Sequence, residues 1–233
     1  MGSLTSIERD CIERSSAGPM LGQVEAWAAV NSGSRNLAGL ATMAGLLADA
    51  FSALPGELSL VEPAPVEAVN RAGKTVAIDH GRNIHLKVRP GAPVQLLFTG
   101  HMDTVFDVDH PFQSTSWLED GVLGGPGVAD MKGGIAVMLA ALKAVEEGGA
   151  ALNLGYEIIL NSDEEVGSPG SAALIADAAR GKRAALTYEP AALPDGTLAG
   201  ARPGSGNFSF VVRGRSAHAG RNPEDGRNAI VAA

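Results

Sequence analysis

Histidine and acidic residues occur in this chain where apolar segments end. The apolar run Val94–Thr99 leads through Gly100 to His101 and Asp103, which are two residues apart. In an extended segment that spacing puts both side chains on the same side. A metal-bound imidazole usually donates its second ring nitrogen to a carboxylate or carbonyl, so Asp103 is placed to orient His101. A surface-loop histidine beside a turn aspartate is the alternative that this short pattern leaves open.

Asp130 lies in a second candidate segment, the glycine-rich stretch GGPGVADMKGG, which leads into a predicted helix. Aspartate is also a common cap at helix N-termini, so the residue alone does not indicate a ligand. A phosphate-binding loop is excluded, because the stretch lacks both the third glycine of a dinucleotide-binding loop and the Lys-Ser/Thr pair of a nucleotide-binding loop.

Further acids follow two other apolar segments. Glu164 and Glu165 end a run of three acids after residues 156–161, and Glu189 comes directly after residues 184–188. A run of acids can be a solvated turn. Alternatively, one carboxylate binds a cation while its neighbour activates water, and the cation offsets the repulsion between them.

Apolar spacing predicts the elements that position these residues. Helices are predicted at residues 20–31, 36–54, 130–147 and 171–179, and strands at residues 57–61, 66–70, 75–78, 84–88, 94–99, 156–161 and 184–188. Strands that alternate with crossover helices indicate an α/β fold with a mixed, largely parallel sheet covered by helices on both faces. Such a sheet places ligands beyond the carboxyl ends of its strands, where the candidate residues lie. Their convergence there predicts a metal site.

The composition of the sequence changes past Pro194, where the stretch DGTLAGARPGSGN, typical of a loop, begins. We place a domain boundary near residue 199, which divides the chain into residues 1–199 and 200–233. In the second part, residues 207–213 alternate like a half-exposed antiparallel strand, and residues 228–233 resemble the first turns of a helix.

Composition limits the possible functions. Of the 233 residues, 45% are hydrophobic and 19% charged, which is typical of a folded globular protein. The net charge of -8 argues against non-specific binding to nucleic acid or to anionic membranes. The single cysteine, Cys11, excludes an internal disulfide and a thiolate zinc cluster. No stretch approaches the roughly 20 apolar residues of a membrane span, and the charged N-terminus does not resemble a signal peptide, so we expect a cytoplasmic protein.

Five motifs in this order and spacing resemble one family. They are TGHMDTVF, GPGVADMKGG, NSDEEVGSPGS, YEP and GRSAHAGRNPEDGRNAI. They are similar to those of the co-catalytic zinc peptidases that include glutamate carboxypeptidase, acetylornithine deacetylase and succinyl-diaminopimelate desuccinylase. The likeness covers about residues 94 to 233 and is nearest to the glutamate carboxypeptidases. It implies a zinc-dependent hydrolase of peptide or N-acyl amino-acid bonds, a catalytic domain at residues 1–199 and the beginning of an α+β lid and dimerisation domain at residues 200–233.

The resemblance also implies a role for each candidate residue. His101 and Glu189 bind one zinc ion, Asp130 bridges both ions, and Glu165 binds the second. Glu164 is the general base, Asp103 orients His101, and His218 reaches the active site of a partner subunit to stabilise the oxyanion. A cis peptide between Asp130 and Met131 is expected. Because histidine and carboxylate ligands accept several divalent ions, Co²⁺ or Mn²⁺ could replace Zn²⁺.

The resemblance implies further that the chain is truncated. Relatives return from the lid to supply another zinc-binding histidine and an arginine that binds the substrate carboxylate, and neither has a counterpart after His218. We therefore expect this chain to bind one zinc ion better than two and to hydrolyse poorly. The full-length protein is expected to be a homodimer acting on small peptides or N-acyl amino acids.

Two other classes of function remain open. One is a catalytically silent metal-binding or interaction protein, which the expected truncation favours and the intact Glu164 argues against. The other is a plain structural α/β domain, which would require every acid at a strand end to be coincidental.

Overall fold

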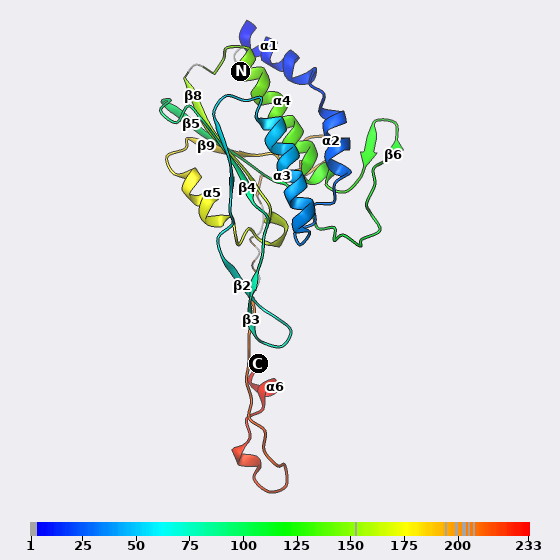
Figure 1. The fold of residues 1–233 in the computed structure, drawn as a ribbon, viewed down its shortest axis with the longest axis vertical. Coiled ribbons are helices and arrows are strands. Elements are labelled where there is room, and N and C mark those ends of the chain that lie inside the picture. The colour runs from blue at the N-terminus through cyan, green and yellow to red at the C-terminus, as the bar shows by residue number, and fades with distance from the viewer. Residues whose placement is uncertain are drawn as a thin grey trace.

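A five-stranded sheet forms the centre of the protein (Figure 1). The computed structural model describes residues 4–151, 153–193, 195–198, 200–201, 204, 206 and 208–233. The strands, in their order across the sheet, are β1 (Glu57–Val61), β4 (Asn83–Val88), β8 (Leu154–Asn161), β5 (Val94–His101) and β9 (Ala184–Thr187). β4 runs antiparallel to the other four strands, which all point the same way. The predicted mixed, largely parallel α/β sheet is confirmed.

Helices cover both faces of this sheet, as predicted (Figure 1). One face carries α2 (Met20–Ala28), α3 (Leu37–Phe51) and α4 (Gly133–Glu147), and the other carries α5 (Ala172–Ala179). Successive strand residues alternate between the faces, so the side chains of Ile158 and Leu160 join the core under α3 and α4. Ile159, between them, packs with Leu97 and Ala178 under α5.

The first helix, α1 (Ser6–Ser16), was not predicted. It packs beside α4, but none of its residues is buried. Its sequence lacks the complete apolar stripe that would have indicated a helix. Its N-terminus carries a capping box, in which Thr5 accepts from the Glu8 N–H and the Glu8 carboxylate accepts from the Thr5 N–H. The spacing of Thr5 and Glu8 is the signal that could have identified this helix.

Two hairpins project from the central sheet. The first, β2 (Val66–Val69) with β3 (Thr75–Ile78), was predicted as two strands. The second, β6 (Ser116–Glu119) with β7 (Val122–Gly124), was not predicted. Its turn, Asp120-Gly121, is a common hairpin signal, and Gly121 has a φ of 79°.

The predicted strand at residues 207–213 is wrong for the part that the structure describes. Residues 208–213 join no sheet, and Val211 lies near the β2–β3 turn, where a Cβ added to Gly73 would be 3.2 Å from Val211 Cγ1. An alternating pattern becomes a strand only when a neighbour accepts its main-chain hydrogen bonds. The short helix α6 (Ala229–Ala232) confirms the predicted helical start. Residue 199, at the predicted boundary, lies outside the described residues, and the division into domains stays a prediction.

No helix within the described ranges has both the length and the apolar character needed to cross a bilayer.

An ion-pair cluster lies on the α5 side of the sheet. The Glu157 carboxylate is 2.6 Å from His85 Nε2 and 2.6 Å from Lys182 Nζ. All three side chains are at most 16% exposed. Burial raises the pKa of Glu157, but the hydrogen bonds from Lys182 and His85 outweigh it and lower the pKa below its usual value. The charged form of Glu157 therefore stabilises the fold.

We expect Glu157→Gln to lower the free energy of unfolding by about 1–3 kcal/mol at pH 7, because the charged hydrogen bonds are lost. This contribution is complete above the unfolded-state pKa, near 4.5, and is lost as the pH falls through the lower folded-state pKa. Urea unfolding at pH 7, 5 and 4 should show the difference shrinking toward pH 4. Glu25→Gln, at an exposed position, is the control, and an equal loss for both variants at pH 7 would contradict the prediction.

Candidate metal centre

The three parallel strands β8, β5 and β9 lie side by side, so their carboxyl ends form one edge of the sheet. His101, the last residue of β5, is level with Asn161 at the end of β8. The acids Glu164 and Glu165 follow β8 on one side of His101, and Glu189 follows β9 on the other. The order of the strands thus brings together residues that are up to 88 positions apart in the sequence.

The other three predicted ligands lie around the His101 imidazole. Its Nε2 is 3.0 Å from Asp130 Oδ1 and 3.4 Å from Glu189 Oε1. His101, Asp130 and Glu165 offer ligand atoms that all lie within 4.8 Å of one another. One imidazole nitrogen with several carboxylate oxygens is a donor set that suits Zn²⁺ and also accepts Co²⁺ or Mn²⁺. The residues present therefore fit a divalent metal ion.

Asp103 connects His101 to the acidic loop. Its carboxylate is fully buried, accepts hydrogen bonds from the main-chain N–H groups of Glu164 at 3.1 Å and Glu165 at 3.2 Å, and accepts from Ser34 Oγ at 2.7 Å. His101 Nδ1 lies 3.0 Å from the Asp103 carbonyl oxygen and 3.3 Å from its Oδ1. Asp103 therefore orients the His101 ring and holds the backbone of the loop that carries Glu164 and Glu165.

Asp163 stabilises the same acidic loop through hydrogen bonds within residues 161–171. Its buried carboxylate accepts hydrogen bonds from the Gly170 N–H at 2.6 Å, Ser171 Oγ at 2.6 Å and Asn161 Nδ2 at 3.3 Å. Its carbonyl accepts from the Ser168 N–H at 2.7 Å. These bonds hold residues 161–171 as a compact turn, from which the side chains of Glu164 and Glu165 project toward the site.

Asp130 lies in an irregular turn, Val128–Lys132, before α4. The peptide between Asp130 and Met131 is cis, as the resemblance implied. Met131 is fully buried, and its sulfur accepts a hydrogen bond from the His101 N–H at 3.2 Å. Gly100 makes room for it, because a Cβ there would lie 2.9 Å from Met131 Cε.

The acids perturb each other's protonation. Burial lowers the pKa of His101, but hydrogen bonds to Asp103 and Glu189 outweigh it and raise the pKa to about 11. Burial, with the charge of Asp130, raises the pKa of Glu165 to about 7. Desolvation, with the charge of Glu189, also raises the pKa of Glu164, against the opposing effect of His101. A cation would replace the protons that these groups retain.

His218 is not among the residues that gather here. It is exposed, and its Nδ1 accepts a hydrogen bond from the Gly220 N–H. Figure 1 shows the described residues from 208 onward extending away from the sheet. Its assigned role in a partner subunit's site stays a prediction.

Three residues that contribute to the geometry of the site were not predicted: Ser34, Asp163 and Lys132. Ser34 and Lys132 make contacts with residues 69 and 105 positions away, which no local pattern shows. Asp163 had a signal, because a strand-end acid followed by Gly167, Ser168 and Gly170 is typical of a turn closed by side-chain hydrogen bonds.

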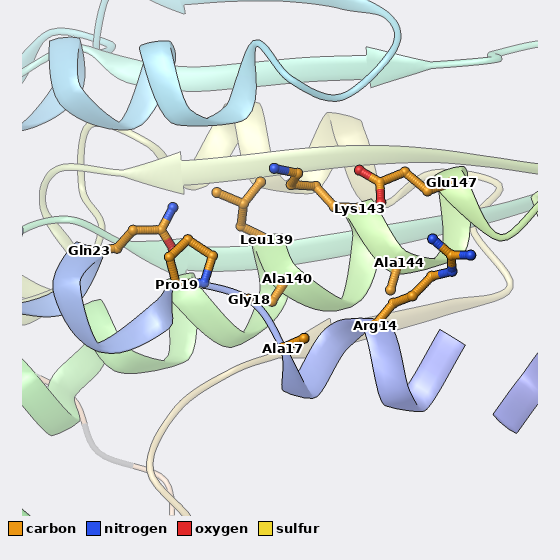
Figure 2. A pocket seen from close by; sticks show the side chains of 10 residues that line it. All are labelled: Arg14, Ala17, Gly18, Pro19, Gln23, Leu139, Ala140, Lys143, Ala144 and Glu147. Carbon is orange, nitrogen blue, oxygen red and sulfur yellow. The ribbon is translucent and has the colours of Figure 1, made fainter. Parts of the chain in front are cut away.

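A separate pocket lies between α1 and α4 (Figure 2). Its charged lining residues are Arg14, Lys143 and Glu147, and none of the candidate site residues lines it. The pocket is therefore not part of the metal centre.

The profile of the peptidase family M20/M25/M40 matches residues 97–223, which is more than half of the chain. The chain belongs to this peptidase family. The match contains every candidate site residue, from His101 to His218.

Curated relatives agree with this family. Carboxypeptidase G2 from Pseudomonas sp. (strain RS-16) is 35% identical over 160 residues, which are 69% of this chain and 39% of the relative. Acetylornithine deacetylase from Proteus mirabilis (strain HI4320) is 33% identical over 145 residues, 58% of this chain and 34% of the relative. The chain thus spans between a third and two fifths of the length of these relatives.

Solved structures show the same fold. Human carnosine dipeptidase 1 has a TM-score of 0.58 at 20% identity, with 76% of this chain and 38% of that one covered. The dipeptidase Dug1p from Saccharomyces cerevisiae has a TM-score of 0.61 at 15% identity, with 78% and 40% covered.

We expect metal binding to release protons. At pH 7 about one proton should leave His101, whose pKa is about 11, and part of another should leave Glu165, whose pKa is about 7. At pH 9 the contribution of Glu165 should vanish. Calorimetric titration with Zn²⁺ in buffers of different ionisation enthalpy measures this number. In Glu165→Gln the release should change little between pH 6 and 8, and binding without proton release at pH 7 would refute the prediction.

Proposed function

We propose that this chain contributes the metal-binding and proton-transfer residues of a zinc-dependent hydrolase that cleaves peptide or N-acyl amino-acid bonds. The observation that carries the proposal is the cluster in which ligand atoms of His101, Asp130 and Glu165 lie within 4.8 Å of one another, beside Glu189 and Glu164. Membership of the M20/M25/M40 peptidases supports the same class of reaction.

His101 and Glu189 would hold one zinc ion, Glu165 a second, and Asp130 both. Zinc supplies an acidified water and polarises the carbonyl of the scissile amide. Glu164 accepts the proton of the attacking water and hands it to the leaving nitrogen. Its raised pKa suits both steps, because a general base and acid works best when its pKa approaches the working pH.

Asp103 supports this chemistry without touching the substrate. It accepts from the main-chain N–H groups of both Glu164 and Glu165, so the base and one metal ligand keep a fixed relation to His101. Outer partners of this kind commonly change metal affinity by about 10–100-fold when they are replaced.

Within this class we propose a glutamate-carboxypeptidase-like exopeptidase. The relative that shares 35% identity is a carboxypeptidase. The family resemblance further implies that the deacetylases have aspartate at the position of Glu189, so the glutamate here favours the carboxypeptidase branch. Dimerisation through residues 200–233 and the role of His218 belong to the same proposal.

Glu164→Gln should lower kcat for an N-acyl-glutamate by about 10²–10⁴-fold, because general acid–base catalysis contributes that much. Its zinc content should match that of the parent, since Glu164 is not assigned as a ligand. Elemental analysis and initial rates provide both readouts. Asp130→Asn is the matched comparison and should lose metal as well as turnover.

The assay is run on this 233-residue chain and on the product of the whole open reading frame. Turnover that survives Glu164→Gln would refute the assignment of the base. Zinc binding without turnover in either protein would favour the catalytically silent metal-binding protein. Absence of zinc from both would overturn the site itself.

A further inference from the structure

Lys132 is a buried cation that the proposed mechanism does not use. Its side chain is 1% exposed, and no carboxylate of the described residues lies within ion-pair distance of its Nζ. The Nζ instead donates to two main-chain oxygens, those of Trp27 at 3.2 Å and Val30 at 3.1 Å. Burying an ammonium group without a counter-ion costs free energy. Another contribution of this side chain to the protein must offset that cost.

The two carbonyls that Lys132 contacts lie at the C-terminal end of α2: Trp27 is in its last turn, and Val30 is two residues past Ala28. The last carbonyls of a helix lack partners within the helix, and the helix dipole makes this end negative. Trp27 and Ala28 are themselves buried against the core. The contact therefore ties the turn before α4 to a fixed point on a different helix, 105 residues earlier in the chain.

Asp130 depends on its neighbours for its position. Its own side chain is 56% exposed, and its one side-chain hydrogen bond in the described structure goes to His101. The next two residues, Met131 and Lys132, are fully buried. Met131 fastens the turn to the end of β5 through the His101 N–H, and Lys132 fastens it to α2. The main-chain N–H of Lys132 also donates to the Gly127 carbonyl at 2.8 Å.

Gly127 shows how closely the turn is fitted around Lys132. It has a φ of 72°, and a Cβ at this position would lie 3.0 Å from both Cδ and Cε of Lys132. The same Cβ would lie 2.9 Å from Thr104 Cγ2, just beyond Asp103. The lysine stem therefore fills the space between the turn and the segment that follows His101.

We propose that Lys132 is a positioning residue for the metal centre, which sets the place of the Asp130 carboxylate by fastening its turn to the C-terminal end of α2. The inference rests on the proposed function, because it assigns Asp130 to the metal. It predicts that removal of the ammonium group weakens metal binding through Asp130, although Lys132 touches neither metal nor substrate.

The test compares two lysine-to-methionine variants. Lys132→Met keeps the length of the stem but removes the lysine donor from the Val30 oxygen and leaves the Trp27 oxygen with the Val30 N–H alone. Lys182→Met is the matched control, because Lys182 is also largely buried but pairs with Glu157 on the α5 side of the sheet. Each protein is titrated with Co²⁺, whose visible spectrum reports coordination geometry, then with Zn²⁺ in competition, and its Tm is measured without metal.

We expect Lys132→Met to bind Co²⁺ about 10–100-fold more weakly than the parent, with altered visible bands. Lys182→Met should lower Tm but bind Co²⁺ as the parent does. Lys132→Gln, which keeps an uncharged NH₂ donor group on a shorter stem, should recover part of the affinity. It replaces Lys132→Met in the comparison if that variant does not fold.

Parent-like affinity and spectrum in the folded Lys132 variant, with a lowered Tm, would overturn the inference and leave the proposed function intact. A parent protein that binds neither Co²⁺ nor Zn²⁺ would overturn both. An equal loss of affinity in Lys182→Met would also overturn the inference, because the effect would then follow from stability alone.

Discussion

The buried carboxylate of Asp103 is the interaction on which the site depends. It joins three parts of the chain: the end of β5, the segment before α3 that contains Ser34, and the acidic loop after β8. A fully buried carboxylate is tolerated only when hydrogen-bond donors surround it. Here the donors are the Ser34 hydroxyl and the N–H groups of Glu164 and Glu165, so the same bonds that satisfy this charge also fix the loop.

The direction of the strands explains why one edge of the sheet collects the remaining residues. Since β8, β5 and β9 are parallel neighbours, all three end at the same edge of the sheet, and each is followed by a polar segment. His101 lies on the middle strand, so acids from both sides can reach its imidazole. An antiparallel arrangement of these three strands would have sent one of the acidic segments to the opposite edge.

Much of this arrangement could be predicted because it depends on local pattern. Apolar runs, and the glycine, proline and polar residues that end them, indicate where the strands end, where the helix after Asp130 lies and which acids come close to His101. The contacts of Ser34 with Asp103 and of Lys132 with Trp27 could not be predicted, because they join segments whose proximity exists only after folding. The strand predicted at residues 208–213 is wrong for a related reason. The residues alternate as in a strand, but the described structure has no neighbouring strand to pair with them.

The site combines buried residues that hold the backbone with more exposed residues that are proposed to bind the metal. Asp103, Asp163, Met131 and Lys132 are at most 1% exposed, whereas Asp130 and Glu189 are 56% and 30% exposed. Burial, together with the negative charges of the neighbouring carboxylates, raises the pKa of both Glu164 and Glu165. Before a cation arrives, His101 holds Asp130 and Glu189, but no side-chain hydrogen bond within the described residues holds Glu164 or Glu165. The buried residues Asp103, Asp163, Met131 and Lys132 therefore fix the backbone in the geometry that the cation needs.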